Sequence, residues 1–99
     1  MEIEQVPASD WETWVARNEG VVLDVREPYE WELGTLPGAI RIRLGELPNS
    51  LDELDPEIPT LVVCRSGNRS QQAAVFMQMS GFESAANMAG GMKALGLQQ

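Results

Sequence analysis

The chain has 99 residues, 43% of them hydrophobic and 22% charged, a composition typical of one soluble globular domain. A single cysteine, Cys64, and the lack of histidine exclude a Ser-His-Asp triad, a Cys-His pair, histidine-containing metal sites, an intramolecular disulfide and a CxxC redox centre. The net charge of −8, from 7 basic and 15 acidic side chains, disfavours binding to nucleic acids and to anionic membranes.

The amino-terminal residues do not resemble a targeting signal. Glu2 and Glu4 occupy positions where a signal peptide needs basic residues and an apolar run. No later stretch approaches the roughly 18 uninterrupted apolar residues that a membrane span requires. Together with the lone thiol, these features predict a cytoplasmic protein that forms one domain over residues 1–99, and we expect neither a metal nor a cofactor.

The first predicted element is a helix. Ser9 to Glu12 match an S-x-x-E capping box, which predicts a helix to about Asn18 with Trp11, Trp14 and Val15 on its inner face and Gly20 as its stop. The continuous apolar run 21–25 then predicts a strand that is covered on both faces, as in a parallel sheet.

Shorter elements are expected in the middle of the chain. Pro28 suits the first position of a short helix through Glu32, and residues 39–42 follow a Pro-Gly turn as a second strand. Residues 44–54 predict a weak helix that Pro48 interrupts and Ser50 restarts as a cap.

The last third of the sequence repeats the alternation of strand and helix. Residues 60–63 predict a central strand, residues 70–80 a helix that Gly81 ends, residues 85–88 another strand, and the residues after Gly90 and Gly91 a short helix. Strands that alternate with helices predict an α/β domain with a mostly parallel sheet and helices on both faces.

The acidic residues are unevenly distributed. The 25 residues from Ile58 to Phe82 contain no Asp or Glu, and this segment carries Cys64, Arg65 and Arg69. Cys64 follows a predicted buried strand, and ligands of open α/β sheets bind at the carboxyl ends of the strands. The sequence therefore places its only thiol in the least acidic part of an acidic protein.

A cysteine in this position can be activated without histidine. A free thiol with a pKa near 8.5 is only a few per cent thiolate at pH 7. Backbone N–H groups of Arg65 to Ser70 could form an anion-binding nest, Gly67 permits the positive φ that such a nest needs, and the following helix directs its positive end at the sulfur. The residues alone leave two interpretations open: a nucleophile, or an inert buried thiol.

Several motifs resemble those of a known family. The segment Cys64-Arg65-Ser66-Gly67-Asn68-Arg69-Ser70 resembles the active-site loop of rhodanese-like single-domain sulfurtransferases. The same family's LDVRE segment, GHIPGA turn and carboxyl-terminal signature resemble residues 23–27, residues 34–39, and Gly81-Phe82 with Asn87 and Gly90-Gly91. Thr35 replaces the family's common histidine in the turn, and the tryptophan often found in the final helix is missing.

The resemblance implies a central, mainly parallel sheet of about five strands between helices. It also implies that Cys64 carries sulfur as a persulfide, taken from a small anionic donor such as thiosulfate and passed to cyanide, a thiol or a protein acceptor. Arg65 and Arg69 would bind the donor, and the loop of Ser66, Gly67 and Asn68 would hold the outer sulfur.

Three further residues are predicted to support the loop. Ser70 closes the resembling motif. Asp24 and Arg26 end a predicted strand beside the site, which suggests an ion pair that buttresses the loop, although a simple strand-end cap explains them equally well.

Other functions remain as alternatives. A cysteine phosphatase uses a C-x5-R loop, whereas Arg69 follows Cys64 in a C-x4-R pattern, and an arsenate reductase would need a second cysteine. A non-catalytic sulfur carrier or docking module fits the same motifs, because fold and loop do not reveal the acceptor.

Overall fold

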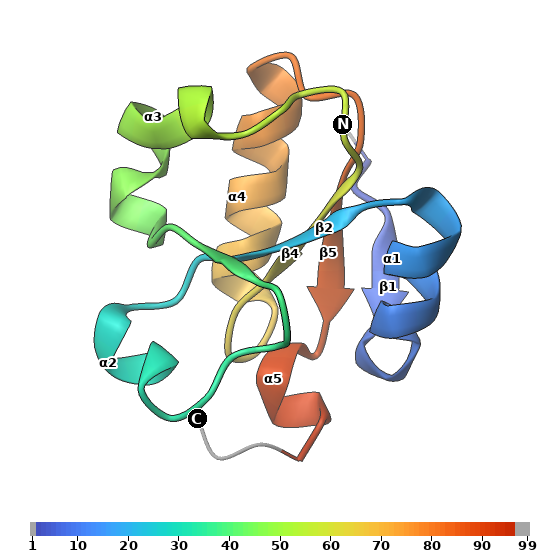
Figure 1. Ribbon diagram of the computed structural model, residues 1–99, viewed down its shortest axis with the longest axis vertical. Helices are drawn as coiled ribbons and strands as arrows, with labels where there is room; N and C mark the ends of the chain where they lie inside the picture. Colours follow the sequence, from blue (N-terminus) through green and yellow to red (C-terminus); the bar gives the residue numbers. More distant parts are fainter. Residues whose placement is uncertain (1, 97–99) are drawn as a thin grey trace.

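The computed structural model describes residues 2–96, and its centre is a sheet of five parallel strands in the order β1-β5-β4-β2-β3. The α/β fold with a parallel sheet is thereby confirmed. The strands, drawn in Figure 1, are β1 (Gln5–Pro7), β2 (Val21–Asp24), β3 (Ile40–Arg41), β4 (Thr60–Val63) and β5 (Ala85–Ala89).

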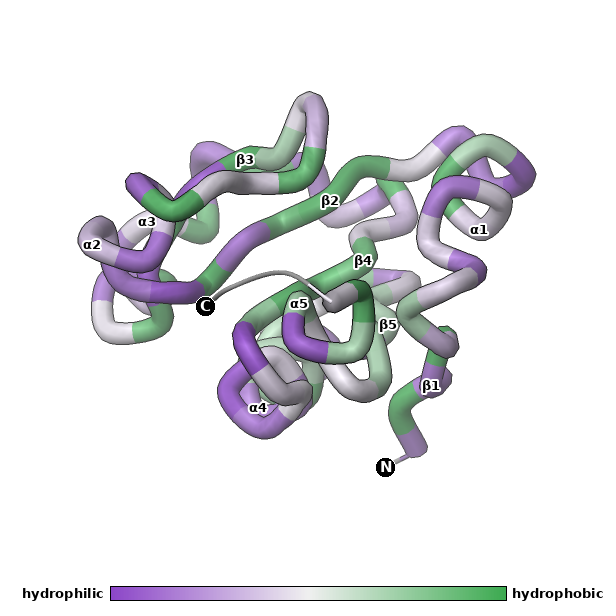
Figure 2. Tube along the Cα trace, turned by 90° about the horizontal axis from the view of Figure 1, so that it is seen from below, coloured by the Kyte–Doolittle hydropathy of each residue, from purple (hydrophilic) through white to green (hydrophobic). Residues whose placement is uncertain are grey.

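Helices cover both faces of this sheet, as Figure 2 shows in end view. One face packs against α3 (Leu47–Ser50) and α4 (Asn68–Met79), and the other against α1 (Trp11–Asn18) and α5 (Gly91–Ala94). The short helix α2 (Pro28–Trp31) lies near the carboxyl ends of the strands. None of the helices in residues 2–96 has the length and apolar character needed to cross a bilayer.

The central strand β4 explains why a continuous apolar run forms here. All four of its residues are buried, with Val62 facing the α3/α4 side and Leu61 and Val63 facing the α1/α5 side. Side chains of a strand alternate between faces, so a strand covered on both faces needs apolar residues at every position.

Helix α1 ends at Asn18 as predicted, but its start and its caps differ from the prediction. Ser9 lies in a 3-10 turn over Ala8–Asp10 and makes no capping bond, because the Trp11 N–H is already bonded to the Ala8 carbonyl. The left-handed residue after α1 is Glu19, with φ 51°, rather than Gly20. A Cβ on Gly20 would lie 2.6 Å from the Pro59 carbonyl oxygen, so this glycine allows close packing instead.

The predicted weak helix over residues 44–54 is three short pieces. A 3-10 turn at Leu44–Glu46 leads into α3, and a second 3-10 turn follows at Leu51–Glu53. Pro48 does not interrupt the chain, because it lies in the first turn of α3, where a missing N–H costs nothing. Ser50 precedes the second turn but makes no side-chain capping bond.

Two further differences matter for the site. Helix α4 begins at Asn68, two residues earlier than predicted, with Gly67 as its cap residue at φ 102°. The edge strand β1 has no counterpart in the prediction. Its three residues are too few to show the hydrophobic pattern of a strand. They form a strand because they pair with β5.

Candidate active site

The loop that carries Cys64 connects β4 to α4 at the carboxyl edge of the sheet, where α2 and α5 also lie (Figure 1). Cys64 is 1% exposed, whereas Arg65, Ser66 and Asn68 are exposed and Gly67 is buried. The loop thus surrounds the sulfur and presents its polar side chains to solvent.

Backbone amides point at the sulfur of Cys64. The Gly67 N–H donates to Sγ at 3.1 Å, the Ser70 N–H donates at 3.4 Å, and the Ser70 hydroxyl oxygen lies 3.2 Å from Sγ. Ser70 lies in the first turn of α4, where amides have no partner inside the helix. The predicted amide nest and helix end therefore occur together at one atom.

The outer surface of the loop is held by the first residues of α5. The amides of Met92 and Lys93 donate to the carbonyls of Cys64 and Arg65, both at 2.9 Å. A Cβ on Gly91 would collide with these two carbonyl groups, and Gly91 has a φ of 63°. Because the carbonyls bond outward to α5, the loop can turn its amides inward to the sulfur.

These contacts decide the ionisation of the thiol. Burial raises the pKa of Cys64, but hydrogen bonds from the Ser70 hydroxyl and from the Ser70, Gly67 and Ser66 amides outweigh it. The pKa of Cys64 is therefore lower than that of a free thiol, which favours the nucleophilic thiolate.

The two loop arginines differ in their surroundings. Arg69 forms a bidentate pair with Glu30 of α2, with nitrogen-to-oxygen distances of 2.7 and 2.9 Å. The hydrogen bond from Arg69 lowers the pKa of Glu30 below its ordinary value despite burial. Arg65 is exposed, with no ion pair to the residues that the structure describes. The charge of Arg69 is thus balanced, while that of Arg65 is available to an anion.

Asp24 and Arg26 form the predicted ion pair, with both side chains fully buried. Three hydrogen bonds from the Arg26 side chain reach the Asp24 carboxylate, and a fourth reaches the Gly34 carbonyl at 2.6 Å. The pair ties the end of β2 to the segment after α2. Its side chains make no hydrogen bond to the loop of residues 64–70, so the buttressing role of the pair stays a prediction.

Sequence reasoning missed two side chains of the site. Glu30 was part of a predicted helix, and Asn87 was noticed only as part of a motif, yet Asn87 accepts a hydrogen bond from the Ser70 hydroxyl. Asn87 lies in a buried strand, where its two neighbours in sequence are alanine and methionine. A polar residue inside an apolar strand was the available signal, since buried amides need hydrogen-bond partners.

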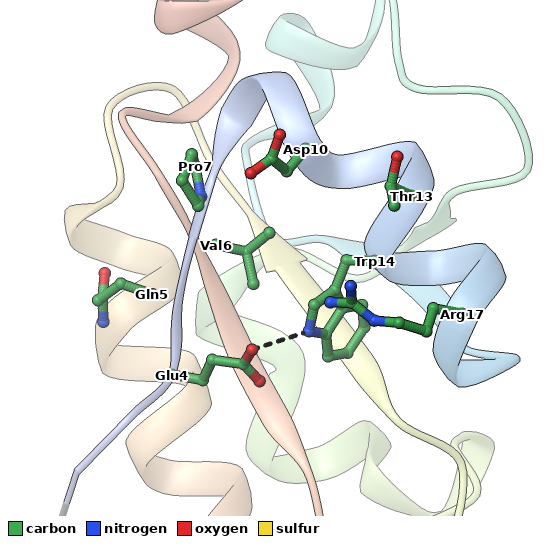
Figure 3. A pocket seen from close by; sticks show the side chains of 8 residues that line it. All are labelled: Glu4, Gln5, Val6, Pro7, Asp10, Thr13, Trp14 and Arg17. Atoms are coloured by element: carbon green, nitrogen blue, oxygen red, sulfur yellow. Dashed lines mark hydrogen bonds between the residues drawn. The ribbon is translucent and has the colours of Figure 1, made fainter.

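A pocket of about 250 Å³ lies elsewhere, between β1 and α1 (Figure 3). In it, the Trp14 indole donates to the Glu4 carboxylate at 3.2 Å. No residue of the Cys64 loop lines this pocket, so it does not belong to the candidate site. Its lining consists of Glu4, Gln5, Val6, Pro7, Asp10, Thr13, Trp14 and Arg17.

Comparison with known proteins identifies the class of this fold and site. The family model for the rhodanese-like domain matches residues 8–97. The chain therefore belongs to the rhodanese-like family, as the loop motif indicated.

Individual relatives agree with this assignment. YtwF of Bacillus subtilis is 34% identical over 95 residues, covering 95% of this chain and 91% of that protein. The thiosulfate sulfurtransferase GlpE of Pseudomonas entomophila is 36% identical over 78 residues, covering 78% and 72%. The chain spans only 29% of the rhodanese-like/PpiC domain-containing protein 12 of Arabidopsis thaliana and 39% of YrkF of Bacillus subtilis, each 39% identical.

Solved structures share the fold. The rhodanese-like domain protein of Staphylococcus aureus has a TM-score of 0.85 at 25% identity and covers 97% of each chain. The human single-domain sulfurtransferase TSTD1 has a TM-score of 0.80 at 25% identity, covering 95% of this chain and 96% of that one. The protein is thus a rhodanese-like member of a family of sulfurtransferases and sulfur carriers.

Proposed function

We propose that this protein transfers sulfane sulfur from a small anionic donor such as thiosulfate to cyanide or a thiol through a persulfide on Cys64. The observation that carries the proposal is the sulfur of Cys64 at the focus of the Gly67 and Ser70 amides. The GlpE relative, named a thiosulfate sulfurtransferase, supports the choice of donor.

The reaction consists of two displacements. In the first, the Cys64 thiolate attacks the outer sulfur of thiosulfate, a new S–S bond forms, and the old S–S bond breaks with its electron pair leaving on sulfite. In the second, cyanide or a thiolate attacks the outer sulfur of the persulfide, and Cys64 leaves again as thiolate. Neither step needs a histidine base, because the lowered pKa of Cys64 favours the thiolate and sulfite is a stable anion.

The residues of the loop have separate roles in this scheme. The exposed Arg65 guanidinium attracts the donor, and the outer sulfur extends about 2 Å beyond Sγ toward the exposed residues Ser66 and Asn68. Arg69, already paired with Glu30, fixes the first turn of α4 rather than serving as a free anion receptor. Cys64 is buried, so transfer takes place at the outer sulfur, which the acceptor can reach.

Mass spectrometry and a coupled assay test the proposal. After incubation with thiosulfate, the wild-type chain is expected to gain one sulfur atom and to lose it on addition of cyanide, with thiocyanate as product. Cys64→Ser is the matched control and should do neither. Persistent thiocyanate formation by Cys64→Ser would exclude this mechanism, and loading without turnover would identify a sulfur carrier that needs a partner.

A further inference from the structure

A chain of side-chain hydrogen bonds runs from Cys64 to the edge of the sheet. The Ser70 hydroxyl donates to the Asn87 Oδ1 atom, and the Asn87 Nδ2 atom donates to the Gln5 Oε1 atom at 2.8 Å. Gln5 Nε2 in turn donates to the backbone carbonyl of Ile3 at 3.1 Å and to Gln71 Oε1 at 2.7 Å. Figure 3 shows Gln5 on the side of β1 that faces α4, away from Trp14.

The Ile3 carbonyl sets the direction of this chain. A backbone carbonyl can only accept, so the Gln5 atom beside it must be the amide nitrogen, and Gln5 therefore turns its oxygen toward Asn87. Asn87 must therefore donate to this oxygen through its NH₂ group, and its own oxygen then faces Ser70. The Ile3 carbonyl, which can only accept a hydrogen bond, thus sets the orientation of the Gln5 and Asn87 side-chain amides.

The orientation of Asn87 determines where the single proton of the Ser70 hydroxyl can be donated. Two acceptors lie within reach of this proton, the Asn87 oxygen and the Cys64 sulfur 3.2 Å away. When Cys64 is a thiol, it can donate to Ser70 while Ser70 donates to Asn87, and every group is satisfied. When Cys64 is a thiolate, Ser70 can serve the sulfur only by leaving the buried Asn87 oxygen without a donor, which costs free energy.

We propose that Gln5 and Asn87 are positioning residues that hold the Ser70 hydroxyl proton away from Cys64, so that the edge strand β1 restrains thiolate formation at the site. This inference rests on the proposed function in that it concerns the same nucleophile. It adds that the reactivity of Cys64 is set in part by Gln5 of β1, whose side chain is hydrogen-bonded to Asn87 of β5 and Gln71 of α4. Without Gln5, the Asn87 amide can turn over and donate to Ser70, and the hydroxyl becomes free to donate to the thiolate.

The charged groups around Cys64 take no part in the chain of hydrogen bonds from Ser70 to Gln5. Arg69 of α4 is balanced by Glu30 of α2, Asp24 and Arg26 at the end of β2 balance each other, and Arg65 is exposed on the loop itself. Lys93 of α5 is exposed beyond the Arg65 carbonyl. A neutral substitution at Gln5 alters none of these charges, so a change in the titration of Cys64 would come from the hydrogen-bond chain.

A thiolate titration of the full chain, free of any sulfur donor, tests the proposal. Ultraviolet absorbance of the thiolate and the rate of alkylation by iodoacetamide are followed against pH. Gln5→Met, which keeps the length of the side chain without its hydrogen bonds, should move the midpoint down by about half a pH unit, a threefold rise in the thiolate-to-thiol ratio. Gln5→Ala should do the same, and it replaces Gln5→Met if that variant does not fold.

Two controls distinguish an effect of the hydrogen-bond chain from a general loosening of the fold. Gln71→Met removes only the outermost bond and should leave the midpoint unchanged. In a Ser70→Ala background, Gln5→Met should have no effect, because the hydroxyl through which it acts is gone. An unchanged midpoint in Gln5→Met and Gln5→Ala, or an equal shift with and without the Ser70 hydroxyl, would overturn the proposal, whether or not the protein transfers sulfur.

Discussion

Cys64 is the residue whose chemistry depends most on its surroundings. The position of a cysteine at the end of a strand does not by itself indicate whether it is a thiol or a thiolate. Burial alone would raise the pKa of Cys64 and favour the thiol. The backbone amides of Gly67 and Ser70 donate to the sulfur and oppose this tendency. The activation of the nucleophile therefore comes mainly from backbone dipoles rather than from a general base.

Because the pKa of Cys64 is lower in the folded chain than in the unfolded one, folding stability should depend on pH. The stabilisation by the thiolate is fully present above the unfolded pKa of about 8.5 and is lost as the pH falls through the folded pKa. Urea unfolding of the wild type and Cys64→Ser should show a difference in unfolding free energy that grows as the pH rises through this window. Each pH unit between the two pKa values contributes about 1.4 kcal/mol. A constant difference would contradict a lowered pKa.

Asp24 provides a second test at this scale, because its partner Arg26 is fully buried. Asp24→Ala leaves an uncompensated buried charge and should cost about 3–5 kcal/mol of stability. Sulfur transfer per folded molecule should fall by a smaller factor, since the pair does not touch the sulfur. The double variant Asp24→Leu with Arg26→Met is the control and should recover stability. A larger loss of activity than of stability would assign Asp24 a direct role.

Among the secondary-structure elements, the β4–α4 loop depends on the start of α5. The amides of Met92 and Lys93 hold the outer carbonyls, and this approach is possible only because Gly91 lacks a Cβ. The Gly90-Gly91 pair reads in sequence as an ordinary turn. Its packing against the back of the loop could not be predicted, because it joins residues about 27 positions apart in the chain.

Gly91→Ala should therefore destabilise the fold by about 2 kcal/mol or more and reduce sulfur loading of Cys64. Gly38→Ala is a matched control: Gly38 also has a positive φ, 75°, but a Cβ there meets nothing within 4 Å. Its cost should be limited to backbone strain of about 1 kcal/mol. Thermal unfolding and mass spectrometry measure both effects, and equal losses in the two variants would argue against the collision with the loop.

For the whole molecule, a net charge of −8 opposes the approach of an anion, while the acid-free segment 58–82 carries the loop. Arg65 is the exposed cation of that loop, and Arg69 is balanced by Glu30. The rate of reaction with an anionic donor thus depends on the charges near the loop rather than on the net charge of the protein.

Arg65→Gln should raise the KM for thiosulfate about fivefold at low ionic strength, and the effect should shrink as salt screens the charges. Arg17→Gln changes the net charge equally but lies on α1, which leads into the amino end of β2, and it should alter KM little. Steady-state kinetics over a range of salt concentrations provide the measurement. An equal effect of both variants would show that total charge, not Arg65, controls donor binding.

The alternation of strands and helices, the buried strand β4 and the loop around Cys64 are all predictable from the sequence. These features are local, because a continuous apolar run and the loop motif each lie within a few residues. The early start of α4, by contrast, follows from Gly67 at positive φ and from the sulfur that accepts the Ser70 amide in its first turn.

The groups that meet at and around the sulfur are brought together by long-range packing of the fold. Pairing of Arg69 with Glu30 joins positions 39 residues apart, and the link from Asn87 to Gln5 joins positions 82 residues apart. No periodicity in the chain encodes such contacts, since they depend on the order of strands in the sheet, with β1 beside β5. The parallel pairing of these two strands places Gln5 beside Asn87 and completes the surroundings of Cys64.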